Sequence, residues 1–280
     1  MDTIAAVKLR CPDCGKAAGS LGRATTCPGC GRAFAPDEGV WDLRPRSLDA
    51  RKDHEDRVHA ETGLPTWRRL FFHKRYWLEW CETRWLPELL AARPASFLEI
   101  GGGLCYASAL AKGRVPAARV VATDISPRYL RQHAVRTGAI LGTPADVYAA
   151  ADAEALPFED GEFQAVFSQV VLYRLPDPAR ALREIRRVLA PGGRYLGIER
   201  ASPWAPWFAR REARALDERA RAQGTGERPR RYRDWEALLA EAGWESGAVT
   251  PVPGRRVRAR WLRRLGNAAR PIYVAIRLAR

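Results

Sequence analysis

Long apolar segments are missing from this 280-residue chain. No stretch of 18 consecutive residues is apolar, so we expect no membrane-spanning helix. The first eleven residues hold no apolar core of the length that a secretory signal peptide needs. The sequence therefore predicts a cytoplasmic protein without a transmembrane segment.

Lysine is scarce, because only five of the 47 basic residues are lysine and the rest are arginine. Such a skew is typical of a coding bias, so the placement of charge is more informative than the net charge of +15. The last 30 residues hold nine arginines and no acid. The arginine-rich residues 255–264 have three possible interpretations: a solvated basic helix that caps the sheet, an RNA contact, or peripheral contact with an anionic membrane.

Disulfides are not expected from the six cysteines. Four of them form two C-P-x-C-G knuckles, namely Cys11, Cys14, Cys27 and Cys30. In a reducing compartment, paired CxxC motifs indicate a metal site, and four thiolates suit a structural Zn²⁺ with no open coordination position. We predict a zinc ribbon over residues 1–45, followed by a linker over residues 46–65.

A glycine turn dominates the middle of the chain, in the segment Ser96–Lys112 with the sequence SFLEIGGGLCYASALAK. A strand, a glycine turn and a helix start in this order are typical of a nucleotide-binding α/β unit. Glycine lets backbone amides approach a ligand closely, and the helix start adds free N–H groups. A dinucleotide fingerprint would need glycine at position 106, which is tyrosine.

Strands and helices alternate after this turn. We predict strands over residues 119–124, 147–151, 164–168 and 194–199, and a closing antiparallel pair over 247–252 and 272–278. Asp124 ends the second strand 21 residues after Gly103, a spacing that suits a carboxylate accepting hydrogen bonds from a ribose diol. The pattern predicts an α/β fold with a parallel sheet covered by helices on both faces.

Several segments together resemble the motifs of the class I S-adenosylmethionine (SAM) dependent methyltransferases, in particular the ubiquinone/menaquinone-biosynthesis-like branch, type 11. They are LEIGGG, VATDIS, ADAEALPFEDGEFQAVFS and LREIRRVLAPGGRYLGIE. The resemblance implies a Rossmann-like seven-stranded sheet within a domain over residues 66–280. Compared with a minimal domain, this one has inserts over residues 201–233 and 253–270.

The resemblance also implies SAM as cofactor and a role for each matching position. The methionine end would be surrounded by Glu99, Gly101 and Gly103. The nucleoside would be bound by Asp124 at the ribose, Ile125 against the adenine, and Asp152 and Ala153 at the adenine edge. Ser168 and Gln169 would face the transferring methyl group.

Three positions depart from the family pattern. Cys105 occupies the position where the family usually has a third glycine. Gln164 replaces the usual aspartate at the start of the fourth strand, and Tyr173 replaces a histidine found in many members. None of them removes a cofactor-binding carboxylate, so SAM binding is still expected.

No catalytic base is evident from the sequence. The candidates near the expected pocket are His73, Tyr173 and Glu199. The aromatic helix predicted over residues 66–90 either packs between the ribbon and the main domain or lines the acceptor pocket.

Three functions are compatible with these features. The first is methyl transfer to a small-molecule or lipid-like acceptor. The second is methylation of ribosomal or transfer RNA, since the ribbon followed by GVWDLRP resembles the start of bacterial ribosomal-RNA guanine-N1 methyltransferases. The third, a non-catalytic zinc-ribbon interaction protein, is disfavoured by intact Asp124 and Asp152. The acceptor atom and the oligomeric state are not encoded in these motifs.

Overall fold

The computed structural model describes residues 6–48, 52, 65–201, 211, 214–215, 218, 230–245, 247–252 and 272–280. The predicted insert 253–270 and most of the predicted insert 201–233 lie outside the described residues. Among the described residues, no helix is both long enough and apolar enough to cross a membrane.

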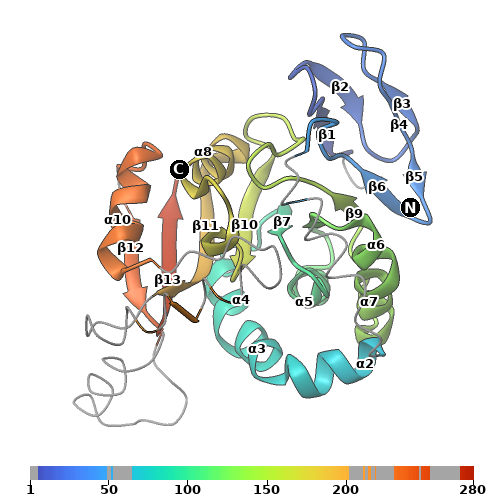
Figure 1. Ribbon diagram of the computed structural model, residues 1–280. Helices are drawn as coiled ribbons and strands as arrows, with labels where there is room; N and C mark the ends of the chain where they lie inside the picture. The colour runs from blue at the N-terminus through green and yellow to red at the C-terminus, as the bar shows by residue number, and fades with distance from the viewer. Residues whose placement is uncertain are drawn as a thin grey trace.

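A nine-stranded sheet forms the centre of the molecule, in the order β12-β13-β11-β10-β7-β8-β9-β6-β5 (Figure 1). Seven of its strands are the predicted ones: β7 (Ser96–Ile100), β8 (Arg119–Asp124), β9 (Val147–Ala150), β10 (Phe163–Gln169), β11 (Leu189–Ala201), β12 (Gly247–Pro251) and β13 (Ile272–Ala279). Strands β6 to β11 run parallel, and β13 is antiparallel to β11 and β12. The predicted Rossmann-like fold is confirmed.

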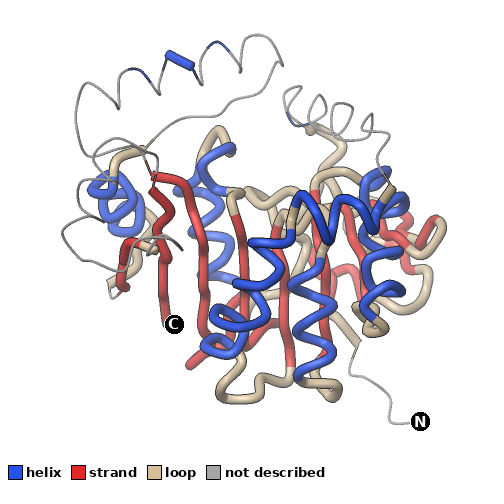
Figure 2. Tube along the Cα trace, turned by 90° about the horizontal axis from the view of Figure 1, so that it is seen from below, coloured by secondary structure: helices blue, strands red, loops and turns tan. Residues whose placement is uncertain are grey.

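Helices cover both faces of the sheet, as its alternating side chains require. Leu98, Val121 and Val166 belong to the core beneath α8 (Pro178–Val188) and α10 (Tyr232–Glu241). Their neighbours Phe97, Val120 and Phe167 belong to the core of the opposite face. That face carries α5 (Tyr106–Arg114), α6 (Pro127–Tyr129), η3 (Leu130–Ala134) and α7 (Val135–Leu141), together with the helical run 66–89 (Figure 2).

The sequence predicts helix N-caps at Ser126, Asp177 and Asp234, and helices begin as predicted at two of these three positions. The side chains of Ser126 and Asp177 accept hydrogen bonds from the first turns of α6 and α8, as expected of N-caps. Asp234 was expected to cap α10, and this is wrong. The helix begins at Tyr232, and the Asp234 carboxylate reaches back to the Arg231 N–H at 2.6 Å from the third helical position.

The N-terminal segment shares the main sheet. Strands β1 (Lys8–Arg10), β2 (Ala17–Ser20), β3 (Thr25–Thr26) and β4 (Ala33–Phe34) form two small hairpins. Strands β5 (Pro36–Asp37) and β6 (Val40–Asp42) instead extend the nine-stranded sheet. Val40 pairs with Tyr148 and Trp41 with Ala149, so β6 is a parallel neighbour of β9.

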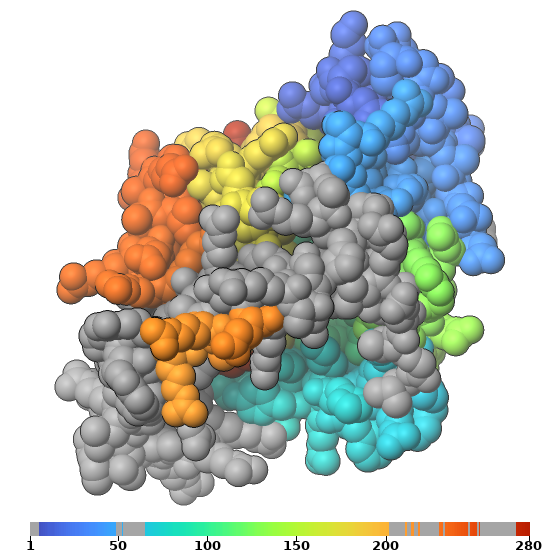
Figure 3. Space-filling view, viewed as in Figure 1, coloured from blue at the N-terminus to red at the C-terminus, as the bar shows by residue number. Residues whose placement is uncertain are grey.

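The ribbon also contacts the chain on either side of β9. The Arg10 N–H donates to the Pro157 carbonyl at 3.1 Å, beyond the end of β9. Arg131 forms an ion pair with Asp37 at 3.0 Å. Figure 3 shows the blue N-terminal segment adjoining the green segment. The loop after β9 is therefore held between the ribbon and the sheet.

The predicted aromatic helix is a run of α-helical and π-helical pieces: α2 (Thr66–Arg68), η1 (Arg69–His73), α3 (Arg75–Trp80), η2 (Cys81–Trp85) and α4 (Leu86–Leu89). Each π turn adds one residue and rotates the next helical piece around the axis. Helical spacing in the sequence predicts Phe71 on the apolar stripe of this helix and Trp80 off it. In the structure Phe71 is 43% exposed, whereas Trp80 is 7% exposed.

Candidate functional site

A cavity of about 440 Å³ opens at the carboxyl ends of the central strands. Its floor consists of segments at the ends of four strands: 100–104 at the end of β7, 124–125 at the end of β8, 151–153 after β9 and 169–171 at the end of β10. The strand order reverses between β7 and β10, and ligands of open α/β sheets bind at such a point. The volume is within the range of small-molecule sites, about 300–1,000 Å³.

The glycine turn needs left-handed backbone. Gly101 and Gly103 have φ values of 61° and 56°. A Cβ on Gly101 would lie 2.6 Å from the Val171 side chain, so the close approach also excludes larger residues. Cys105 replaces the family's third glycine yet keeps a glycine-like φ of 52°, with its side chain buried. Cys105 thus adopts the left-handed backbone that a glycine would adopt at this position.

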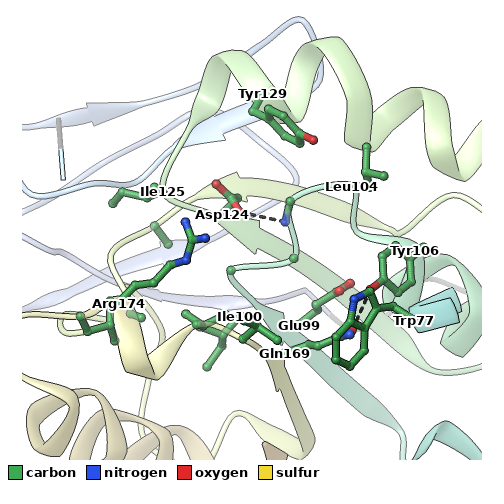
Figure 4. Close-up of a pocket in the computed structure, with 18 of the residues that line it drawn as sticks. Trp77, Glu99, Ile100, Leu104, Tyr106, Asp124, Ile125, Tyr129, Gln169 and Arg174 are labelled. Atoms are coloured by element: carbon green, nitrogen blue, oxygen red, sulfur yellow. Dashed lines mark hydrogen bonds between the residues drawn. The ribbon is translucent and has the colours of Figure 1, made fainter. Parts of the chain in front are cut away.

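Asp124 lies opposite the turn, as Figure 4 shows. One carboxylate oxygen accepts from the Gly103 N–H at 2.8 Å and the other from the Ser126 N–H at 3.0 Å. Each oxygen keeps a second lone pair, so the carboxylate is oriented and can still accept from two vicinal hydroxyls.

Glu99 lies beneath the turn with its side chain in the cavity wall. Its carboxylate accepts from the Ser108 N–H and hydroxyl at 2.7 and 2.6 Å. Burial nevertheless raises the pKa of the Glu99 carboxyl to about 7. A cationic group placed beside it would favour the ionised form.

Lys52, a residue of the predicted linker, was not expected in the site. Its ammonium lies 2.6 Å from the Asp152 carboxylate and 2.8 Å from that of Glu154, and all three residues are buried. The other Glu154 oxygen accepts from the Asp177 N–H at 2.8 Å. The contact joins residues 100 positions apart, so no local pattern could have indicated it.

Of the two residues expected to face the methyl group, one lines the cavity and the other does not. Gln169 lines the cavity, and its side-chain oxygen accepts from the Tyr106 hydroxyl at 2.7 Å and the Cys81 thiol at 3.5 Å (Figure 4). Ser168 is fully buried, bonds the Tyr195 hydroxyl at 2.8 Å, and does not line the cavity. The other expected cofactor residues all do: Glu99, Gly101, Gly103, Asp124, Ile125, Asp152 and Ala153.

None of the three candidate bases lines the cavity. The π turn places Lys74 on the cavity side, and His73 is exposed. Tyr173 is buried, and its hydroxyl accepts from Arg174 at 3.0 Å. The buried Glu199 carboxylate accepts N–H groups of Val171, Leu172 and Tyr173, so it positions the loop after β10.

The four ribbon thiols form a cluster whose Sγ atoms all lie within 4.8 Å of one another. The distances are 3.6 Å between Cys11 and Cys30 and 3.5 Å between Cys14 and Cys27. Tetrahedral Zn–S bonds of about 2.3 Å place sulfur atoms roughly 3.8 Å apart, so the donor set and its geometry fit a four-coordinate metal.

Comparison with known proteins identifies the central part of the chain. A family model described as "Methyltransferase domain" matches residues 98–197. The chain is 36% identical over 117 residues to the demethylmenaquinone methyltransferase of Thermus thermophilus, covering 41% of this chain and 51% of that protein. It is 38% identical over 106 residues to the malonyl-[acyl-carrier protein] O-methyltransferase of Halorhodospira halophila, covering 38% and 35%.

Residues 98–197 of the chain therefore match a methyltransferase domain. The fold agrees: the solved geranyl diphosphate C-methyltransferase of Streptomyces coelicolor superposes with a TM-score of 0.61 at 14% identity, covering 83% of this chain and 99% of that one. The chain spans between about a third and a half of the length of its curated relatives. The match thus concerns the methyltransferase domain and not the whole of those proteins.

Replacing Lys52 should leave two buried carboxylates of the methyltransferase domain without their cation. Removing one partner of a buried ion pair costs about 3–5 kcal/mol. We expect Lys52→Met to lower the free energy of unfolding by about that amount, measured by urea denaturation. The exposed Lys8→Met serves as the matched control, and equal stability of the two variants would contradict this role.

Glu199 should make stability depend on pH. Its pKa is raised by burial to about 7 from an ordinary value of 4.5, so between these values the folded state holds a proton that the unfolded state releases. Stability should therefore fall as pH rises from 4.5 through 7, by roughly 3 kcal/mol in total at 1.36 kcal/mol per pKa unit. Glu199→Gln should flatten the curve of melting temperature against pH, and the exposed Glu236→Gln should not. If the melting temperature of Glu199→Gln depended on pH as steeply as that of the unchanged protein, titration of Glu199 would be excluded as the cause of the pH dependence.

Proposed function

We propose that the protein transfers the methyl group of SAM to a small-molecule or lipid-like acceptor. One observation carries the proposal: the glycine turn, Asp124 and Asp152 meet around a single cavity at the switch point of a methyltransferase sheet. When bound, SAM would supply a methyl group activated by a sulfonium. Asp124 would accept from the ribose hydroxyls and Asp152 from the adenine amino group.

Alignment is the main contribution that the described residues offer to catalysis. Displacement at a methyl carbon needs the acceptor in line with the breaking bond, and positioning alone lowers such barriers substantially. Among the described residues, the carboxylates that line the cavity are Glu99, Asp124 and Asp152, and all three occupy cofactor positions. We therefore assign no general base, and Gln169 is the polar side chain best placed to orient the acceptor.

The acceptor class is supported by the curated relatives, whose names specify a demethylmenaquinone and a malonyl group on a carrier protein. The RNA alternative depends partly on the basic residues 255–264, which lie outside the described residues. It is kept as an outcome of the experiment below.

Isotopically labelled SAM tests the function directly. Incubated with fractionated extract of the source organism, the protein should label small-molecule or organic-soluble fractions. Label that RNase removes would favour the RNA alternative instead. Asp124→Ala should weaken binding of S-adenosylhomocysteine by about tenfold or more, as loss of hydrogen bonds to a charged group predicts. Unchanged affinity would refute the cofactor assignment.

We further propose that the thiol cluster holds a structural Zn²⁺. The purified protein should contain one zinc per chain by elemental analysis. Cys27→Ser should lose the metal and lower the melting temperature by more than about 5 °C, the shift that a loss of about 2 kcal/mol produces. Cys81→Ala, outside the cluster, should keep the metal. Zinc well below one per chain would contradict the site.

A further inference from the structure

The helical run 66–89 has an inner side and an exposed side. On the inner side, Arg69 and Trp77 line the cavity. The exposed side carries three large aromatic side chains that are 52%, 43% and 71% exposed, namely Trp67, Phe71 and Phe72. We call these three side chains the aromatic patch. A single exposed apolar residue is ordinary on a protein surface, but several in one short segment often mark a contact site.

The exposed apolar side chains are gathered in one region. Trp67 and Phe72 pack edge to face with ring centroids 6.1 Å apart. Helix α7 packs against α2 and carries Ile140, the one other large hydrophobic side chain that is exposed among the described residues. Figure 3 shows part of the run as the cyan outer surface of the molecule. The surface formed by α2, η1 and α7 is therefore the candidate for a contact with a partner.

The same surface is positively charged. Neither residues 65–78 nor residues 127–141 contain an aspartate or a glutamate. Four basic side chains of these two segments are exposed, namely Arg68, Lys74, Arg75 and Arg136. Arg131 is paired with Asp37 of the ribbon and does not add to this excess. Aromatic rings surrounded by cations are complementary to a partner that is both apolar and anionic.

A lipid surface fits the aromatic patch better than a second protein chain. Aromatic side chains present about 150–250 Å² each, so at these exposed fractions the patch leaves roughly 300 Å² of ring surface in solvent. A stable protein interface needs about 800 Å² from each partner. A lipid surface needs only a shallow insertion of aromatic rings, with basic side chains at the headgroups.

RNA fits the patch less well than lipid. Nucleic-acid bases stack on the free faces of aromatic rings. The edge-to-face contact between Trp67 and Phe72 covers one of the ring faces that a base would need. RNA is therefore an outcome of the test and not the proposal.

We propose that residues 67–75 dock the protein on an anionic lipid surface. The aromatic patch would insert at the boundary between headgroups and acyl chains, and Arg68, Lys74 and Arg75 would bind the lipid phosphates. This inference goes beyond the proposed function and does not depend on it. Lys74 is exposed on this surface and also lines the cavity, so the cavity opens beside the docked face. A lipid-like acceptor could then reach the cavity from the membrane without crossing water.

Co-sedimentation of the full chain with lipid vesicles tests the docking surface. Vesicles of phosphatidylcholine and phosphatidylglycerol in equal parts should bind the protein, and vesicles of phosphatidylcholine alone should bind it at least about tenfold more weakly. Phe72→Ser should weaken binding to the anionic vesicles by at least about tenfold, because such binding scales with the apolar area that is inserted. Phe72→Trp, which keeps an aromatic ring, should bind as the unchanged protein does.

The basic part of the surface has its own matched pair of variants. Arg75→Gln should weaken binding to the anionic vesicles by about fivefold and reduce its dependence on salt. Arg180→Gln removes an equally exposed charge from α8, on the opposite face of the sheet, and should leave binding unchanged. Equal losses in the two variants would mean that net charge alone attracts the protein, and the docking surface would be refuted.

Four further results would overturn the inference. The first is a failure of the unchanged protein to bind anionic vesicles, or equal binding by Phe72→Ser. The second is a fall of more than about 5 °C in the melting temperature of Phe72→Ser, which would mean that the chain itself covers the ring. The third is dissociation of a dimer by Phe72→Ser in light scattering. The fourth is a larger loss of binding to polyuridylic acid than to vesicles. Should Phe72→Ser not fold, Trp67→Ser must show the same loss of vesicle binding.

Discussion

The reversal of strand order between β7 and β10 is the constraint on which the site depends. Segments leaving these two parallel strands diverge to opposite faces of the sheet, and a crevice opens between them. Backbone atoms cannot fill it, so side chains and left-handed glycines form its surface. Gly101 approaches Val171 across the crevice so closely that any side chain at position 101 would collide. The strand order therefore creates the cavity, and the residue types at these positions determine which side chains line it.

Carboxylates in and beneath the crevice are each held by backbone N–H groups. Asp124 accepts from Gly103 and Ser126, and Glu199 from three consecutive residues of the loop after β10. A buried charge is tolerated only when it is hydrogen-bonded or paired. Glu199 does not line the cavity, so it cannot take a proton from an acceptor bound there. Glu199 is for this reason a positioning residue, although its place in the sequence, at the end of the fifth strand, suggested a base.

Sequence reasoning succeeded where a role depends on neighbours along the chain. The glycine turn, the acid at the end of β8 and the caps Ser126 and Asp177 are local features, and the structure has them as expected. It failed where geometry or distant pairing decides. One π turn exchanged His73 for Lys74 at the cavity, and a contact across 100 residues brought Lys52 to Asp152. Neither a change of helical register nor a distant ion pair leaves a periodic signal in one sequence.

The N-terminal ribbon completes the main sheet, and this connects the thiol cluster to the loop after β9. Without β6, β9 would be an exposed edge with unpaired backbone groups. Strand β6 supplies those partners, and the Leu43 N–H extends the pairing to the Ala150 carbonyl, two residues before Asp152. The contact between Arg10 and Pro157 holds the far end of the same loop. The thiol cluster joins the two hairpins that precede β6, so a metal bound there would stabilise the strand that pairs with β9.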